Sequence, residues 1–161
     1  MSTIRIGHGY DVHALAAGNG LMLGGVVIAC DFSFIAHSDG DVLIHALCDA
    51  LLGAMGKGDI GAHFPDRDPK HKDRDSREFL RIVHSMMAHE NYQLGNADIT
   101  IVAQYPKMAP YLNHMKQNLA LDLNADISRL NIKATTTEQL GFIGRREGIA
   151  VHAVVLMEKS S

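Results

Sequence analysis

Several residue types are scarce in this chain, and each scarcity excludes a class of protein. Only two cysteines, Cys30 and Cys48, occur in 161 residues, so a disulfide framework cannot organise the fold. No apolar run is long enough to cross a membrane. The first residues, Met-Ser-Thr-Ile-Arg-Ile, contain neither the apolar block of a signal peptide nor an Arg/Ser-rich transit stretch. We therefore expect a cytoplasmic protein without a membrane partner.

Positive charge is scarce as well. Fifteen Lys and Arg residues against 18 Asp and Glu residues give a net charge of −3, which offers no basic surface for a nucleic acid. The remaining composition, 47% hydrophobic and 20% charged, is that of an ordinary globular protein. A chain of this length suits one domain, residues 1–161, with a sizeable core.

The spacing of apolar residues predicts five strands and three helices. Strands are expected at 3–13, 21–29, 98–104, 130–136 and 149–157. Helices are expected from a start within 37–41 to about 55, from 76 to about 87, and from about 110 to 119. This order predicts an α+β fold in which the helices pack on one face of a mixed β-sheet.

Local signals refine these expectations. The pair Gly24-Gly25 interrupts the second strand, as a bend or bulge would. Ser38 followed by Asp41 is close to a capping box, so we expect Ser38 to cap the first helix. The last strand is apolar on both faces apart from His152, and such a strand is buried on both sides. Because helices cover one face only, we expect another subunit to cover the second face.

Asp11, His13 and His45 are candidate metal ligands. Residues two apart in a strand point to the same face, so Asp11 and His13 can converge on one ion, which His45 reaches from the first helix. Three protein ligands leave a fourth position open, as in catalytic rather than structural zinc sites. The pattern is short, and a surface Asp-x-His pair beside a core histidine would have the same sequence.

Three further segments could hold a phosphorylated nucleotide. His37-Ser38 precedes a helix, whose free N–H groups attract anions, although plain capping would also explain the pair. Thr135 to Glu138 could hold a diphosphate and Mg²⁺, although β-propensity alone explains the threonines. The loop 103–109 could read a nucleobase through its backbone, yet an ordinary proline turn fits equally well.

A long polar loop begins at Gly58 and ends at Lys72. Loops of this length in compact domains are usually functional or mobile. We interpret residues 64–73 as a candidate lid over a site, in which Asp66 could meet substrate hydroxyls.

Six motifs in this order resemble those of the 2-C-methyl-D-erythritol 2,4-cyclodiphosphate synthase family. The motifs are Gly7-His-Gly-Tyr-Asp11-Val-His13, Ala36-His-Ser-Asp-Gly-Asp41, Gly58-Asp-Ile-Gly61, Phe64-Pro-Asp66, Pro106-Lys-Met108 and Lys133-Ala-Thr-Thr-Thr-Glu138. The resemblance extends from Ile4 to about Leu156. Each motif is weak alone, and the specificity comes from their common order.

The resemblance implies a bacterial homotrimer, joined through its sheets, with active sites between adjacent subunits. Its reaction would convert 4-diphosphocytidyl-2-C-methyl-D-erythritol 2-phosphate to 2-C-methyl-D-erythritol 2,4-cyclodiphosphate and CMP, in non-mevalonate isoprenoid biosynthesis. The resemblance also implies Zn²⁺ bound by Asp11, His13 and His45. It implies Mg²⁺ or Mn²⁺ bound by Glu138 and the substrate phosphates.

Site residues follow from the same resemblance. His37 and Thr136 would be catalytic, because they match residues that stabilise the transition state. The residues that would bind substrate are Asp11, His13, His37, Ser38, Asp59, Ile60, Gly61, Phe64, Pro65, Asp66, Arg67, Asp68, Ala103, Gln104, Tyr105, Pro106, Lys107, Met108, Ala109, Ala134, Thr135, Thr136, Thr137, Glu138, Phe142 and Arg145.

Two departures from the family pattern concern a central cavity, where relatives can hold an isoprenoid diphosphate. Arg145 matches the arginine of that cavity, whereas His152 stands where a Glu is often found and Arg146 replaces a common Gly. These changes leave the ligand of the cavity open. Two other functions also stay open: a zinc phosphoesterase that hydrolyses a nucleotide diphosphate, and a non-catalytic trimeric binding module.

Overall fold

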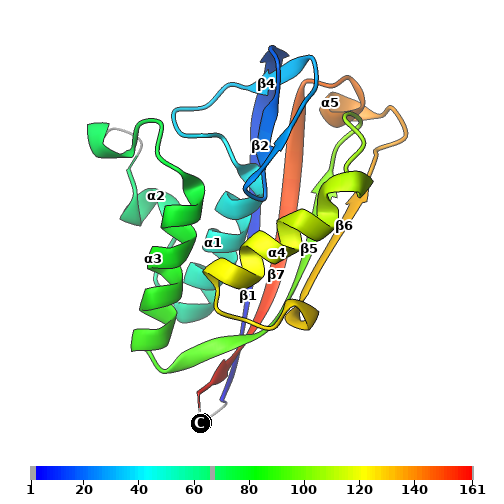
Figure 1. Ribbon diagram of the computed structural model, residues 1–161. Helices are drawn as coiled ribbons and strands as arrows, with labels where there is room; N and C mark the ends of the chain where they lie inside the picture. The colour runs from blue at the N-terminus through cyan, green and yellow to red at the C-terminus, as the bar shows by residue number, and fades with distance from the viewer. Residues whose placement is uncertain (1–2, 66–67, 161) are drawn as a thin grey trace.

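A computed structural model describes residues 3–65 and 68–160 (Figure 1). Asp66 and Arg67, two predicted substrate contacts, lie outside the described residues. The main sheet has the strand order β4-β1-β7-β5-β6. These strands are β1 (Ile4–Ala17), β4 (Phe32–Phe34), β5 (Tyr92–Val102), β6 (Leu130–Thr135) and β7 (Gly148–Lys159). β5 and β6 run parallel and the other pairs are antiparallel, so the predicted mixed sheet is confirmed.

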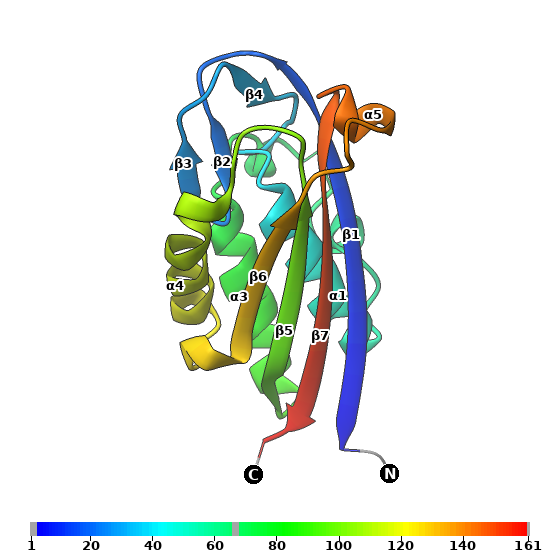
Figure 2. The same ribbon diagram turned by 90° about the vertical axis from the view of Figure 1, so that its right-hand side faces the viewer.

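Three long helices cover one face of this sheet. They are α1 (Val42–Met55), α3 (Ser76–His89) and α4 (Leu112–Asp122). In Figure 2 the strands stand in front of these helices, and the other face of the sheet is open to the viewer. The predicted α+β fold with helices on one face is therefore confirmed. Among the described residues, no helix has the length and apolar character needed to span a bilayer.

Short helical segments fill the connections between these elements. They are α2 (Ile60–His63), α5 (Gly141–Gly144) and the 3₁₀ turns Pro69–His71, Ala109–Tyr111 and Ile127–Arg129. Segments of three or four residues carry no periodic signal, so the sequence pattern did not predict them.

Strand β1 packs closely on α1 because two of its residues lack side chains. Gly7 and Gly9 face α1, where a Cβ atom would overlap the backbone carbonyls of Ala50 and Ala46 respectively. Side chains alternate between the two faces of a strand, so the next odd-numbered residues of β1 also point toward the helices. The close approach thereby places the start of α1 beside the second half of β1.

The structure corrects several predicted boundaries. The predicted strand 21–29 is a hairpin of two strands, β2 (Leu21–Leu23) and β3 (Val26–Ile28). Gly24 and Gly25 form its turn with φ angles of 57° and 70°, which favour glycine. Strand β5 begins at Tyr92 rather than at residue 98, and β1 continues to Ala17. The short strand β4 was not predicted.

The first helix also begins later than predicted. Asp41, not Ser38, is the N-cap of α1, since its Oδ1 accepts a hydrogen bond from Ile44 N at 3.1 Å. The same carboxylate accepts hydrogen bonds from the N–H groups of Gly24 and Gly25, at 2.9 and 2.7 Å. Asp41 is fully buried, and burial raises its pKa to about 6. One buried carboxylate thus ties the β2–β3 turn to the start of α1.

The open face of the sheet exposes apolar side chains in the described chain. Ile6 is 75% exposed, Ile4 and Val154 are each 50% exposed, and Tyr10 and Val12 lie beside them. A group of exposed apolar side chains of this kind marks an interaction surface. Strand β7 accordingly alternates between buried and less buried residues over most of its length. The sequence pattern predicts that both faces of β7 are buried, and burial of the second face would need another subunit.

Candidate functional site

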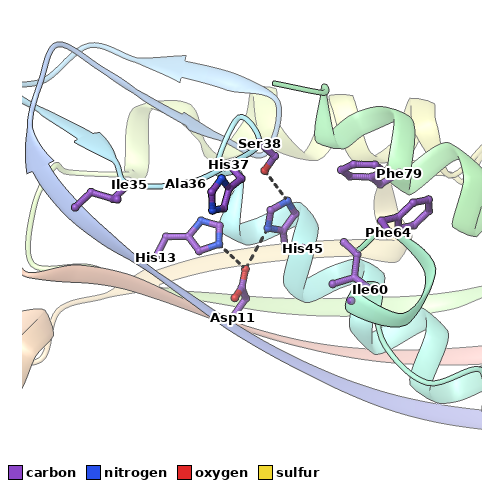
Figure 3. A pocket seen from close by; sticks show the side chains of 11 residues that line it. Asp11, His13, Ile35, Ala36, His37, Ser38, His45, Ile60, Phe64 and Phe79 are labelled. Carbon is purple, nitrogen blue, oxygen red and sulfur yellow. Dashed lines mark hydrogen bonds and ion pairs between the residues drawn. The ribbon is translucent and has the colours of Figure 1, made fainter. Parts of the chain in front are cut away.

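Asp11, His13 and His45 converge as predicted (Figure 3). The first two come from the helix-facing side of β1, and His45 comes from the first turn of α1. Asp11 Oδ2 lies 3.2 Å from His13 Nε2 and 3.2 Å from His45 Nδ1. One ligand atom from each residue lies within 4.8 Å of the others. A single metal ion can bridge atoms at this spacing.

The hydrogen bonding of His13 tests whether a cation fits. Gly40 O lies 2.8 Å from His13 Nδ1, and a carbonyl only accepts, so Nδ1 carries the ring proton. In the neutral ring the lone pair of Nε2 then points at the Asp11 carboxylate, 3.2 Å away. Two electron-rich atoms at this distance repel each other unless a positive charge lies between them. The residues present therefore fit a metal ion.

The pKa values of the group reveal the same demand for positive charge. Burial alone would raise the pKa of Asp11, but its hydrogen bonds and charge interactions with His13 and His45 outweigh burial and hold this pKa well below its usual range. Burial would lower the pKa of His13, yet hydrogen bonding and attraction to the Asp11 carboxylate raise it overall. A proton and a metal ion would therefore compete for the same place.

The three residues form part of the wall of a cavity of about 280 Å³, here called the metal cavity. Phe64 and Phe79 face each other there, with ring centroids 4.5 Å apart. Phe79, on α3, was not among the predicted site residues. The residues that line the metal cavity are Asp11, His13, Ile35, Ala36, His37, Ser38, His45, Ile60, Gly61, Phe64 and Phe79. Predicted site residues from β1, the loop before α1, α1 and α2 thus meet in one place.

Two carboxylates hold α2 at the metal cavity. Asp49 on α1 accepts a hydrogen bond from Ile60 N at 2.7 Å, and Asp59 caps α2 by accepting one from Ala62 N at 2.9 Å. Burial raises the pKa of Asp49. Asp49 had no predicted role, because a single carboxylate on a helix forms no pattern. Asp59 is not among the lining residues, so its predicted substrate contact stays a prediction.

His37 and Ser38 line the metal cavity without lying at a helix start. The Asp41 carboxylate caps the start of α1, so anion binding by His37, Ser38 and that helix start stays a prediction. Ser38 Oγ lies 3.5 Å from His45 Nε2. The loop before α1, rather than the helix, positions both side chains.

Pro65 and Asp68 flank the pair outside the described residues. Asp68 N donates to Pro65 O at 3.0 Å, and Asp68 Oδ1 accepts a hydrogen bond from Lys70 N at 3.0 Å. Asp68 thereby caps the short turn that follows it. Neither residue is among those that line the metal cavity.

The other predicted segments meet at the ends of β5 and β6. Gln139 N donates to Gln104 Oε1 at 3.0 Å, and Ala103 N donates to Thr135 O at 2.9 Å. The two segments predicted to bind the nucleotide therefore lie side by side. Together with α5 they form what we call the edge group, residues 103–109, 134–138, 142 and 145.

Several side chains of the edge group point to solvent in the described chain. Phe142 is 42% exposed, and Arg145 pairs with Glu147 at 2.8 Å on the surface. Glu138 adopts a φ of 52°, and its N–H donates to Thr136 Oγ1 at 3.2 Å. None of the described residues that line the metal cavity belongs to the edge group. Since β7 and β5 separate β1 from β6, one chain builds both parts of the predicted site without joining them.

An Asp-His-His group that could hold a metal ion, at the wall of a cavity in an α+β domain, is typical of proteins with an open metal site, the kind used in catalysis. Comparison with known families is more specific. The YgbB family model matches residues 4–158, and the chain belongs to this family.

Two relatives and one solved structure illustrate this membership. The 2-C-methyl-D-erythritol 2,4-cyclodiphosphate synthase of Thioalkalivibrio sulfidiphilus is 61% identical over 158 residues, which cover 98% of this chain and 99% of the relative. The synthase of Geobacter metallireducens is 59% identical over 156 residues, covering 97% and 99%. The solved structure of Plasmodium falciparum IspF in complex with CDP has a TM-score of 0.89 and 36% identity, covering 100% of this chain and 99% of that chain. The family resemblance seen in the sequence is confirmed.

Proposed function

We propose that this protein converts 4-diphosphocytidyl-2-C-methyl-D-erythritol 2-phosphate to 2-C-methyl-D-erythritol 2,4-cyclodiphosphate and CMP. It would be a phosphorus–oxygen lyase of the non-mevalonate isoprenoid pathway, with residues 1–161 as one synthase domain. The observation that carries the proposal is the Asp11-His13-His45 group at a cavity wall, in a chain 61% identical to a synthase of that name. A cytoplasmic location remains our sequence-based prediction.

The reaction joins two phosphates of one substrate molecule. An oxygen of the 2-phosphate forms a bond to the β-phosphorus, while the bond from that phosphorus to the bridging oxygen breaks and CMP leaves with the electron pair. The 2-phosphate is already anionic at neutral pH, so the protein need not supply a nucleophile. Its task is to hold two anionic groups in line for attack. Positioning of this kind can be worth ~7–11 kcal/mol.

The candidate cofactors divide between the two parts of the site. Asp11, His13 and His45 would hold Zn²⁺, and Glu138 would hold Mg²⁺ or Mn²⁺, for which a carboxylate is a suitable hard ligand. Metal ions bound there would neutralise phosphate charge and polarise phosphoryl oxygens.

Fixed hydrogen-bond donors would act where negative charge develops. His37 and Ser38 line the metal cavity and can donate to phosphate oxygens. Thr136 would donate from the edge group. Ile60 and Gly61, which Asp49 holds at the cavity, would present backbone groups to the ribose.

A homotrimer would complete the site. The open sheet face exposes Ile4, Ile6 and Val154, which an assembly through the sheets would cover. The edge group and the metal cavity lie apart in one chain. We propose that the edge group of one subunit meets the metal cavity of its neighbour, so that each active site needs two chains.

The open faces of three subunits would enclose a central cavity, for which an isoprenoid diphosphate is the candidate ligand. His152 Nδ1 lies 3.2 Å from His8 Nε2 on this face, and its ring centroid is 4.8 Å from that of Tyr10. Arg146 lies over the Tyr105 ring at 5.0 Å. Calorimetry with farnesyl diphosphate tests this ligand, and an absence of heat would reject it.

Phosphorus NMR in ¹⁸O-labelled water tests the reaction directly. The protein is incubated with the cytidine-linked substrate, Zn²⁺ and Mg²⁺, with and without a chelator. We expect CMP and a cyclic diphosphate without incorporated ¹⁸O, and no products with the chelator. A linear bisphosphate carrying ¹⁸O would identify a hydrolase instead, and no turnover would indicate a binding module.

The variant His45→Ala tests whether activity depends on the metal group, by which we mean Asp11, His13 and His45. We expect it to lose zinc and most activity while the protein stays folded, because two ligands hold the ion poorly. His114→Ala is the control, since His114 is exposed on α4 outside the metal cavity. Full turnover with retained zinc in His45→Ala would contradict the assignment.

A further inference from the structure

We propose that Ser76 and Asp39 are positioning residues that fix the ring tautomer of His45 for metal binding. The inference rests on the metal site proposed above. Neither residue lines the metal cavity. Asp39 lies within the motif at 36–41, but neither residue had a predicted role. Each would act through the His45 ring rather than on the substrate.

The His45 ring lies between two polar groups. Its Nδ1 faces Asp11 Oδ2 at 3.2 Å, and its Nε2 faces Ser76 Oγ at 2.9 Å. Ser76 Oγ lies in turn 2.5 Å from Asp39 Oδ1. Ser76 is the first residue of α3 and is completely buried, so water does not compete for its hydroxyl. A continuous chain of hydrogen bonds therefore runs from the metal ligand to Asp39.

The chemistry of these groups determines which group donates and which accepts in each of these hydrogen bonds. A carboxylate only accepts hydrogen bonds, so the single hydroxyl proton of Ser76 must point to Asp39. Ser76 Oγ can then only accept from His45, which places the ring proton on Nε2. The lone pair of Nδ1 is left facing Asp11, at the metal position. Fixing a tautomer in this way is a known role of groups behind metal-binding histidines.

Backbone donors hold Asp39 in the required orientation. Ser76 N donates to Asp39 Oδ2 at 2.9 Å, and Asp41 N donates to Asp39 Oδ1 at 3.1 Å. Ser38 Oγ, at 3.5 Å from His45 Nε2, is too distant to replace Ser76. Ser38 stays available for the substrate contact proposed above.

The tautomers of the two histidines, His13 and His45, are therefore determined by different groups. Gly40 O accepts the ring proton of His13, and the buried Ser76 Oγ, which donates to the half-buried Asp39, accepts that of His45. Both rings then direct a lone pair at one point beside Asp11. Ser76 and Asp39 thus determine the tautomer of the His45 ring, as the carbonyl of Gly40 does for His13.

The test compares Ser76→Ala with Ser76→Thr and Ser85→Ala. Binding of Zn²⁺ alone to the full-length protein is measured by chelator competition, and nitrogen NMR of the metal-free protein reports which His45 nitrogen carries the proton. We expect Ser76→Ala to bind Zn²⁺ about 10–100-fold more weakly and to lose the preference for a proton on Nε2. Ser76→Thr keeps the hydroxyl and should restore both. Ser85 is exposed on the same helix and donates to Arg81 O, so its variant should match the parent.

The variant Asp39→Asn tests the donor-to-acceptor direction of these hydrogen bonds. A carboxamide can donate to Ser76 Oγ, which then frees the Ser76 hydroxyl proton to point at His45. We expect a larger fraction of His45 with its proton on Nδ1, and weaker Zn²⁺ binding. This variant and Ser76→Thr carry the test if Ser76→Ala does not fold.

Unchanged Zn²⁺ affinity and an unchanged tautomer in Ser76→Ala or Asp39→Asn would overturn the inference. Both measurements are made without substrate. A parent protein that binds Zn²⁺ but forms no cyclic product would contradict the proposed function and leave this inference standing.

Discussion

The metal cavity and the edge group differ in how far a single chain completes them. In the metal cavity each ligand histidine makes a second hydrogen bond, to Gly40 or to Ser76, that fixes its ring. The edge group is held mainly through its backbone, and Glu138 and Phe142 are exposed in the described chain. The fold would therefore prepare metal binding within one subunit, and it leaves the proposed nucleotide part without an opposing wall.

This difference separates two requirements of the proposed reaction. Metal binding would depend on internal packing between β1, α1 and α3, whereas turnover would also depend on assembly. Variants that act on only one requirement can therefore distinguish them.

The largest effect is expected where β1 packs on α1. In Gly9→Ala the new Cβ would overlap the Ala46 backbone carbonyl, which no side-chain rotation relieves. We expect a loss of about 3 kcal/mol or more in the free energy of unfolding, and loss of the metal group with it. Urea unfolding at one fixed protein concentration measures this.

Gly53→Ala is the matched control, since Gly53 lies on α1 with no atom within 4 Å of a new Cβ. It should be neutral or more stable by about 0.5–1 kcal/mol, because alanine favours a helix. Equal unfolding midpoints for the two variants would contradict the packing argument.

The next largest effect should fall on assembly. Ile6 is 75% exposed on the open sheet face, so Ile6→Asp should cost a single chain little. In the proposed trimer the new carboxylate would be buried without a partner. We expect dissociation to folded monomers in analytical ultracentrifugation, with zinc retained and activity lost.

Leu121→Asp is the control, because Leu121 is also 75% exposed but lies on α4, on the helix side of the sheet. It should leave the assembly intact. A trimeric, fully active Ile6→Asp would rule out assembly through this face.

The sequence predicted the metal group well because strand and helix periodicity determine which side chains share a face. Asp11 and His13, two residues apart on a strand, could be placed together before the structure was known, and His45 lay on a helix next to that strand. The order of the long elements was predicted for the same reason. Periodicity determines the direction in which each side chain points. For these three residues, that direction was sufficient to place them together.

Other features depended on contacts between segments far apart in the chain. Ser76 faces His45 only because α3 packs beside α1, and Gly9 is required only because α1 approaches β1 closely. Asp41 rather than Ser38 caps α1 because the β2–β3 turn supplies two further donors to its carboxylate. No local pattern carries such information.

A smaller effect is expected from a change confined to the edge group. Glu138→Gln keeps the size of the side chain but removes the charge that would bind Mg²⁺. We expect a rate lower by about 10–100-fold, and a higher Mg²⁺ concentration for half of the maximal rate. Zinc content should not change, because Glu138 is not part of the metal cavity. An unaltered Mg²⁺ titration would reject this role.

The smallest effect concerns the pH dependence of the metal cavity. The Asp11 carboxylate raises the pKa of His13 above its usual 6.5, so below that raised value a bound proton must leave before Zn²⁺ can bind. The pKa of Asp11 is held far lower, so this carboxylate stays ionised in the same range. From the titration of His13 alone, we expect the affinity for Zn²⁺ to fall as the pH falls, by up to about tenfold per pH unit, beginning above pH 6.5. Chelator competition from pH 8 to pH 6 measures the slope, which Glu138→Gln should share with the parent. A constant affinity over this range would mean that His13 is not a ligand.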